Sequence, residues 1–266
     1  MADAAKKDVW ASGDAYELYV GRWSRLVARD FLDWIKAPAG KRWLDVGCGT
    51  GALSQTILEK GAPSSVHGVD PSDGFLELAR RRLTHPRARF EKGDAQALPL
   101  PDGAADVAVS GLVLNFVPDQ AKAAAELRRV LAAGGVAAAY VWDYTGEMQM
   151  MRRFWDAAVA LDPAAREKDE GPRFPLCRPD AFTALFRNAG FRDVTLRAID
   201  APTVFRDFDD YWTPFLGGNG PAPAYCISLN EDRRAALRER LRSTLPAAPD
   251  GKISLIARAF AVRGVK

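Results

Sequence analysis

Over its first 143 residues the chain alternates short apolar runs with longer stretches in which apolar residues recur at helical spacing. The apolar runs predict five strands, at residues 43–46, 65–69, 89–92, 106–110 and 136–142. The stretches between them predict helices at residues 52–60, 74–84 and 120–131. Strands that alternate with helices in this way indicate βαβ units and a parallel sheet in an α/β fold.

The pattern is less regular on either side of this segment. A helix at residues 16–35 is predicted by an apolar stripe of Leu18, Leu26, Val27, Phe31 and Ile35. Beyond it we expect helices at residues 144–161, 180–189 and 231–245, and strands at residues 191–199 and 253–262. Four prolines and several charges between residues 162 and 179 favour a loop or lid. The predicted strands number about seven.

A glycine turn follows the first predicted strand, in the stretch Leu-Asp-Val-Gly-Cys-Gly-Thr-Gly at residues 44–51. Such a turn between a strand and a helix lets backbone N–H groups approach a ligand closely. Gly47, Gly49 and Ala52 also satisfy a loose dinucleotide-binding pattern, so the turn alone does not name its ligand. Asp45 would repel a pyrophosphate but suits an ammonium group. Its alternative role is to cap the turn.

Asp70 ends the second predicted strand, 19 residues after Gly51. A βαβ unit places an acid at about this distance to bind the hydroxyl groups of a ribose. A carboxylate can accept hydrogen bonds from both hydroxyls of a vicinal diol. The sequence therefore predicts a nucleoside at the carboxyl end of this strand.

Composition limits the classes of partner. A chain of 266 residues with 48% apolar residues suits one large α/β domain, or a core domain with a lid. The formal charge of +3 comes from interspersed charges, so we expect no nucleic-acid or membrane-surface partner. The cysteines (Cys48, Cys177, Cys226) and histidines (His67, His85) do not cluster, so we expect no metal. No apolar run is long enough to span a bilayer, and we expect a cytoplasmic protein.

Three further segments complete a family pattern: residues 93–102, which include Asp94 and Ala95, residues 111–116 after the fourth strand, and Leu131 followed by Gly134-Gly135. Together with the glycine turn they resemble class I methyltransferases that use S-adenosylmethionine (SAM). The resemblance is close over residues 42–143. It implies a Rossmann-like seven-stranded sheet of order 3-2-1-4-5-7-6, with helices on both faces, helical lid segments and an antiparallel seventh strand.

The resemblance also implies a cofactor, SAM, with S-adenosylhomocysteine as its product. It puts Asp45 near the amino-acid end of SAM, the glycines against the cofactor, Asp94 on the adenine amino group, and the Ala95 backbone near the adenine ring. The residues expected to bind the cofactor are Tyr16, Arg22, Asp45, Gly47, Cys48, Gly49, Gly51, Asp70, Pro71, Asp94, Ala95 and Ser110.

The helix at residues 16–35 is interpreted in two ways. In the first, the helix closes over the cofactor through Tyr16, Tyr19, Arg22 and Trp23, and Arg22 pairs with the SAM carboxylate. In the second, the helix packs permanently on the core. The resulting division is residues 1–40 as a helical lid, residues 41–143 as the SAM-binding core, and residues 144–266 as acceptor-binding insertions plus the remaining strands. All three parts are expected to form a single integrated domain.

The acceptor site is expected at the carboxyl ends of the fourth and fifth strands and under the lids. Its candidate residues are Asn115, Phe116, Trp142, Asp143, Tyr144, Tyr211 and Trp212, with core packing as the alternative for each. Asn115, Tyr144 and Tyr211 are the candidates for catalysis, and neither histidine is placed to act as a base.

The motifs of DNA-amino, cytosine-C5, protein-arginine and catechol-type methyltransferases are missing, which leaves a small-molecule acceptor methylated at O, N or C, as in ubiquinone/menaquinone-type enzymes. An NAD-type oxidoreductase and a non-catalytic SAM-binding protein stay open as alternatives, and so does the oligomeric state.

Overall fold

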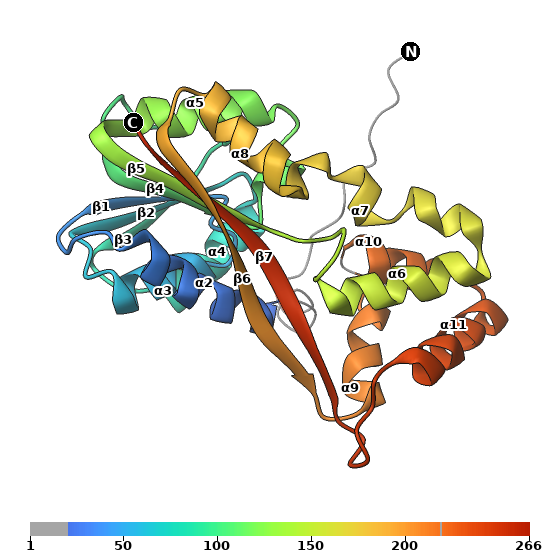
Figure 1. Ribbon diagram of the computed structural model, residues 1–266. Helices are drawn as coiled ribbons and strands as arrows, with labels where there is room; N and C mark the ends of the chain where they lie inside the picture. The colour runs from blue at the N-terminus through green and yellow to red at the C-terminus, as the bar shows by residue number, and fades with distance from the viewer. Residues whose placement is uncertain (1–20, 219) are drawn as a thin grey trace. The chain divides into compact units, whose positions relative to one another are not determined.

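A computed structural model, which describes residues 21–218 and 220–266, contains a seven-stranded sheet of order β3-β2-β1-β4-β5-β7-β6 (Figure 1). The strands are β1 (Arg42–Val46), β2 (Ser65–Asp70), β3 (Ala88–Lys92), β4 (Ala105–Gly111), β5 (Leu131–Trp142), β6 (Arg192–Phe205) and β7 (Ile253–Val265). The strand order implied by the family resemblance is confirmed.

The central strands of the sheet are parallel and buried. β1, β2, β3, β4 and β5 pair in parallel, and β7 lies antiparallel to β5, with Trp142 opposite Ala259. Leu44, Val66 and Ala108 are fully buried in adjacent strands. Runs buried on both faces are typical of parallel sheets covered by helices, which explains why these strands read as continuous apolar segments.

Helices cover both faces of this sheet. In Figure 1, α2 (Arg22–Ile35), α3 (Ala52–Lys60) and α4 (Asp73–Arg82) lie on one face, and α5 (Gln120–Val130) and α8 (Pro179–Asn188) on the other. Phe31 of α2 packs edge-on against Tyr140 of β5, with ring centroids 4.7 Å apart. Leu26 is 37% exposed, so its predicted place on the apolar stripe is wrong, whereas Val27, Phe31 and Ile35 are buried.

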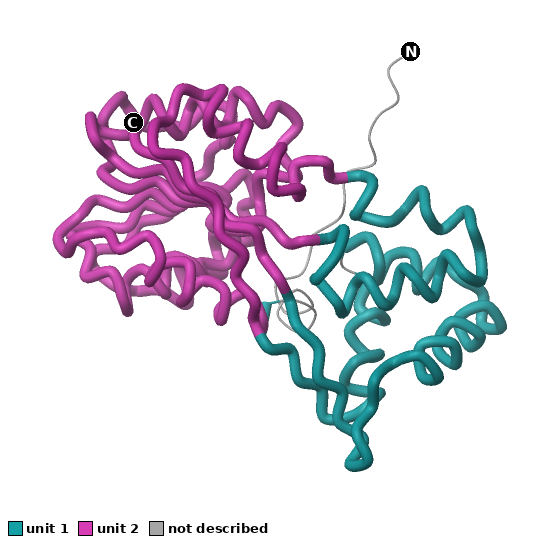
Figure 2. The backbone as a smooth tube through the Cα atoms, viewed as in Figure 1, with its two compact units in different colours: residues 1–22, 144–173, 202–257 teal, residues 23–143, 174–201, 258–266 magenta. Residues whose placement is uncertain are grey.

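The chain divides into two compact units (Figure 2). We call residues 23–143, 174–201 and 258–266 the sheet unit. The described residues of the other unit, at 21–22, 144–173 and 202–257 apart from 219, are called the helical unit. The three-part division predicted from the sequence stays a prediction.

The helical unit is held together by aromatic side chains. Its helices are α6 (Gln149–Leu161), α7 (Glu170–Arg173), α9 (Phe208–Trp212), α10 (Pro221–Ser228) and α11 (Glu231–Thr244). Phe154 of α6 stacks on Phe215 at 4.5 Å between centroids, and Trp155 lies 5.4 Å from Tyr225 of α10. No helix among the described residues is long and apolar enough to cross a membrane.

Two predicted boundaries differ in this unit. α6 begins at Gln149 rather than at residue 144, because residues 144–147 form turns around Gly146, a weak helix former. The segment predicted as a loop at residues 162–179 contains short helical turns, Pro163–Glu167 and Pro175–Cys177, as well as α7. Each of those turns begins with proline, whose missing N–H costs nothing at a first helical position.

Candidate functional site

The glycine turn after β1 presents one open position to a ligand. Gly47, Gly49 and Gly51 all have positive φ angles, which side chains disfavour. A Cβ at Gly47 would lie 2.5 Å from the side chain of Val113, and a Cβ at Gly51 would lie 2.8 Å from Leu83. A Cβ at Gly49 would meet nothing within 4 Å. Packing therefore requires glycine at the outer two positions, while Gly49 faces space that a ligand can enter.

Asp45 lies buried at the end of β1 with half of its carboxylate satisfied. The Ser54 hydroxyl of α3 donates a hydrogen bond to Oδ2 at 2.7 Å, and Oδ1 receives none from the residues the structure describes. Burial raises the pKa of Asp45 to about 7, against the opposing effect of the Ser54 hydrogen bond. A buried carboxyl with a free oxygen is stabilised in its charged form by a cation, so this position suits an ammonium group.

Asp70, at the end of β2, ties the glycine turn to the next loop. Its Oδ2 accepts a hydrogen bond from the Gly49 N–H and its Oδ1 one from the Ser72 N–H, both at 2.9 Å. Burial raises the pKa of Asp70, and the two N–H donors oppose this shift. Each carboxylate oxygen can accept a second hydrogen bond. The carboxylate is therefore oriented by the backbone and can still receive two hydroxyl groups.

The segment after β3 carries an exposed carboxylate and is bonded to the backbone of Asp70. The Gly93 N–H donates to the Asp70 carbonyl oxygen at 3.1 Å, and residues 94–97 then form a tight turn. Asp94 Oδ1 accepts hydrogen bonds from the Gln96 backbone N–H at 2.8 Å and from the Gln96 side-chain amide at 3.1 Å. These bonds lower the pKa of Asp94. It is consequently an ionised acceptor at neutral pH.

The turn after β4 lies against the glycine turn through Val113. Ser110, the residue before Gly111, donates its hydroxyl to the Val46 carbonyl oxygen at 2.8 Å. Leu112 has a φ of 63°, an unusual value for a leucine, of the kind found at functional sites. Asn115 is buried in the next helical turn, and its Nδ2 has no hydrogen-bond partner within the described part of the chain.

Cys48 fills the glycine turn. Its thiol is buried, and burial raises its pKa, with the carboxylates of Asp45 and Asp70 adding to the shift. A thiol held in its neutral form is a poor nucleophile. Cys48 is therefore a packing residue at this edge.

Of the predicted residues, the sheet unit brings nine together near the carboxyl ends of β1, β2, β3 and β4: Asp45, Gly47, Cys48, Gly49, Gly51, Asp70, Asp94, Ala95 and Ser110. Pro71 follows Asp70 and is exposed. Phe116 packs on Phe174 at 5.0 Å, and Trp142 and Asp143 are buried at the end of β5.

Other predicted residues belong to the helical unit. The Tyr211 hydroxyl donates to the Met150 carbonyl oxygen at 2.9 Å, and burial raises the pKa of this phenol, so Tyr211 stays neutral. Arg22 binds Asp210 at 3.2 Å and lies over the Phe205 ring. Tyr144 and Trp212 are buried. Tyr16 and Tyr19 lie outside the described residues.

The sequence interpretation missed two residues with unusual environments. Ser54 completes the environment of Asp45, and no motif spacing marks it. Glu170 of α7 is buried in the helical unit, where the Trp155 indole N–H donates to Oε2 and no described group donates to Oε1. Burial raises the pKa of Glu170 to about 8.

Among the described residues, no group of three or more histidines, cysteines or acids is arranged to hold a metal ion.

Comparisons with known proteins point to one family. Residues 44–139 match a family model described as a methyltransferase domain. The chain is 28% identical to a trans-aconitate 2-methyltransferase of Rhizobium etli, over 86% of this chain and 88% of the relative. It is 33% identical to a ubiquinone/menaquinone biosynthesis C-methyltransferase of Methylobacterium nodulans, over 59% of this chain and 68% of the relative. Other curated relatives are matched over only 31%, 54% and 36% of their own length.

The same fold occurs in a phosphoethanolamine N-methyltransferase of Haemonchus contortus, whose structure contains S-adenosyl-L-methionine. The TM-score is 0.59 at 17% identity, and the match covers 95% of this chain and 56% of that one.

Proposed function

Because this chain belongs to the class I SAM-dependent methyltransferases, we propose that it transfers the methyl group of SAM to oxygen, nitrogen or carbon of a small organic molecule. When bound, SAM supplies an electrophilic methyl group on a sulfonium, which an acceptor attacks in line with the departing sulfur. The names of the relatives, a trans-aconitate 2-methyltransferase and a ubiquinone/menaquinone biosynthesis C-methyltransferase, support an acceptor of small size.

One observation carries this proposal: Gly49, the open position of the glycine turn, donates its N–H to the carboxylate of Asp70, and Asp45 precedes the same turn with one oxygen unpaired among the described residues. Asp45 offers Oδ1 to the ammonium group of the cofactor. Asp70, held by the Gly49 and Ser72 N–H groups, receives the ribose hydroxyls. Asp94 accepts from the adenine amino group. The same arrangement disfavours NAD, because Asp45 would face a pyrophosphate across the glycine turn.

The remaining contribution of the chain is to position the acceptor. Holding two reactants in line and at contact distance can lower a barrier by about 7–11 kcal/mol. We assign part of this task to Asn115, because its buried Nδ2 has no hydrogen-bond partner among the described residues. Asn115 also lies two residues after Val113, which packs on Gly47. An amide N–H at this place suits an oxygen atom of the acceptor.

The test has two stages. Thermal unfolding is first measured with SAM, S-adenosylhomocysteine, NAD and NADP. A ligand at 100 times its dissociation constant stabilises by about 2.7 kcal/mol. We expect only the first two to raise the midpoint. A shift with NAD and none with S-adenosylhomocysteine would refute the proposal.

Release of S-adenosylhomocysteine is then followed with a panel of carboxylic acids, phenols, hydroquinones and amines. We expect acceptor-dependent release by the wild type and much slower release by Asp70→Ala. Binding of the cofactor without release on any member of the panel would favour the non-catalytic alternative.

A further inference from the structure

The segment that carries Asp94 is tied to α5 at both ends of the helix. Near the start of α5, the Asp119 N–H donates to Gln96 Oε1 at 3.0 Å, and Asp119 is the N-cap of the helix. The side-chain amide of the same Gln96 binds Asp94. The orientation of the Asp94 carboxylate is therefore coupled to the position of α5.

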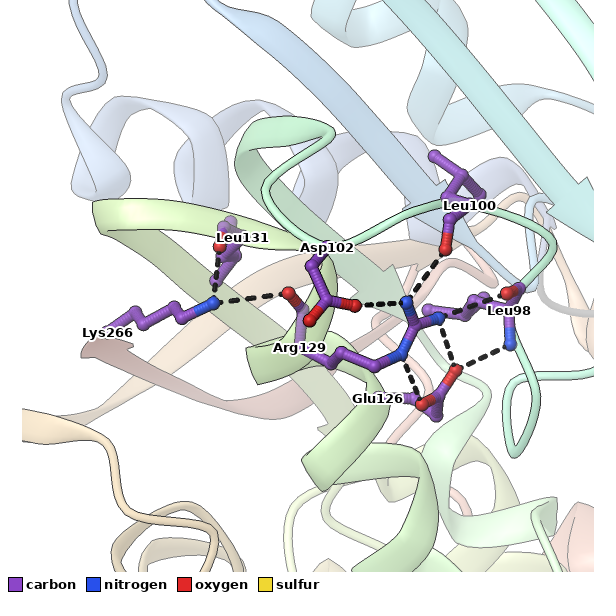
Figure 3. A network of polar contacts seen from close by, with 7 residues as sticks. All are labelled: Leu98, Leu100, Asp102, Glu126, Arg129, Leu131 and Lys266. Carbon is purple, nitrogen blue, oxygen red and sulfur yellow. Dashed lines mark hydrogen bonds and ion pairs between the residues drawn. The ribbon is translucent and has the colours of Figure 1, made fainter.

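The second tie, near the end of α5, is a pair of charged residues one turn apart (Figure 3). Glu126 Oε2 accepts the Leu98 N–H at 2.8 Å. Arg129 donates to the carbonyl oxygen of Leu100 at 2.8 Å and to that of Leu98 at 3.1 Å. Together the pair therefore binds three backbone groups of one short segment.

The pair also holds itself in place. Arg129 Nε and Nη2 bind the two oxygens of Glu126 at 2.7 and 2.8 Å, and Nη1 reaches Asp102 at 2.8 Å. Lys266 Nζ donates to the carbonyl oxygens of Arg129 and Leu131, at 3.1 and 2.6 Å, which fixes the end of α5 (Figure 3). A guanidinium can serve this many acceptors because its five N–H groups are planar and fixed, whereas a lysine ammonium cannot.

These contacts lie at the edge of the hydrophobic core. The Arg129 side chain is 32% exposed and that of Asp102 is 79% exposed, while Leu98 and Leu100 are buried. The pair does not connect strands of the sheet. Its bonds fix the backbone of residues 98–100, which follow directly on the turn that contains Asp94 and Ala95.

We propose that Glu126 and Arg129 are positioning residues for the adenine end of the cofactor, acting through the backbone of residues 98–100 on the carboxylate of Asp94. The inference rests on the proposed function, since it presupposes that Asp94 receives the adenine amino group. It adds that recognition of that amino group depends on a charged pair in α5 that does not touch the cofactor.

The test compares two ligands that differ only at the Watson–Crick edge of the purine. S-adenosylhomocysteine carries the 6-amino group beside an acceptor N1, and S-inosylhomocysteine has a carbonyl oxygen beside an N1–H in their places. A hydrogen bond to a charged acceptor typically corresponds to about a tenfold preference or more. We expect the wild type to prefer S-adenosylhomocysteine by at least about tenfold, measured by calorimetry.

The variants are Arg129→Gln, Arg129→Lys and the matched control Arg128→Gln. Arg128 is the neighbouring arginine, and its side chain donates to the Gly190 carbonyl oxygen, away from the Asp94 segment. We expect both Arg129 variants to bind S-adenosylhomocysteine about tenfold more weakly and S-inosylhomocysteine nearly as well as before, so that the preference falls toward one. Arg128→Gln should keep the preference. Arg129→Lys retains the charge and supplies the measurement if Arg129→Gln does not fold.

The outcomes separate the inference from the function it rests on. A wild type with no preference between the ligands would overturn the placement of Asp94 on the adenine. A wild type with a preference that both Arg129 variants retain would overturn the positioning role. Equal weakening of both ligands in the Arg129 variants would also overturn it, because a purely structural defect lowers both affinities without changing their ratio.

Discussion

The strongest consequence of the site is a pH dependence of cofactor binding that originates at Asp45. The carboxyl is buried, and burial raises its pKa from the ordinary 3.8 to about 7. An ammonium group beside Oδ1 favours the charged form and lowers this pKa. Binding of S-adenosylhomocysteine should therefore release a proton from Asp45 below about pH 7 and tighten as the pH rises.

The magnitude follows from the fraction of Asp45 that is ionised before binding. With a pKa of about 7, roughly one tenth is ionised at pH 6 and roughly nine tenths at pH 8. The apparent dissociation constant equals the intrinsic constant divided by the competent fraction. The dissociation constant of S-adenosylhomocysteine should thus fall about tenfold between pH 6 and pH 8, or by about 1.4 kcal/mol.

Calorimetry in two buffers with different ionisation enthalpies measures both the affinity and the protons released. We expect the release of nearly one proton per bound ligand at pH 6 and of much less than one at pH 8. Asp45→Asn should bind with little pH dependence over this range. The ligand control is 5′-methylthioadenosine, which lacks the amino-acid end and should bind the wild type equally well at both pH values. A flat profile for S-adenosylhomocysteine with the wild type, or the same slope in Asp45→Asn, would refute the assignment of Asp45 to the ammonium group.

Two further substitutions test the carboxylates individually. Asp70→Ala removes two charge-assisted hydrogen bonds to the ribose, each worth about 1.5–3 kcal/mol. The affinity of the variant for S-adenosylhomocysteine, measured by calorimetry, should therefore fall at least tenfold. Unchanged affinity in the folded variant would mean that Asp70 only anchors Gly49 and Ser72. The folded-state pKa of Glu170, about 8 against an ordinary 4.5, means that the folded protein keeps a proton that the unfolded chain releases, so this residue makes the protein less stable as the pH rises from about 5 to 8. Glu170→Gln should lose less stability across this interval in denaturant titrations, and parallel curves for variant and wild type would contradict the raised pKa.

The first half of the fold could be predicted from the sequence because its periodicities are local. The helix predicted at residues 52–60 coincides with α3, and β2 ends at Asp70 as expected. A local signal of the same kind lies in the second half of the chain, where Gly190 stops α8 with a φ of 83°. The place of β7 between β5 and β6 has no such local signal and came from the family resemblance. In the helical unit, ring contacts between α6, α10 and the segment around Phe215 hold the helices together. Such contacts leave no regular spacing of apolar residues in the sequence, so the helix boundaries there were predicted less well.

The candidate site was predictable where its residues follow strands. Asp45 is the last residue but one of β1, Asp70 ends β2, and parallel strands bring their carboxyl ends to one edge. Ser54 and Arg129 were not predictable, because their importance lies in partners 9 to 31 residues away that only the folded chain brings within hydrogen-bond distance. Tyr211 was named as a catalytic candidate because its segment was expected to lie over the acceptor site. In the structure its ring lies 5.4 Å from that of Phe215, and its hydroxyl donates to the Met150 carbonyl oxygen.

The three carboxylates of the proposed cofactor site form a series in burial that matches the three parts of SAM. Asp45 is fully buried, and burial raises its pKa into the neutral range, so a cation beside it increases its ionisation at and below neutral pH. Asp94 is exposed, and its Gln96 hydrogen bonds lower its pKa, so it accepts from a neutral amino group at any physiological pH. Asp70 lies between these extremes, because two N–H donors oppose the effect of burial on its pKa. Only the amino-acid end of the cofactor should therefore be sensitive to pH near neutrality, whereas recognition of the adenine end should depend on geometry, which Glu126 and Arg129 supply.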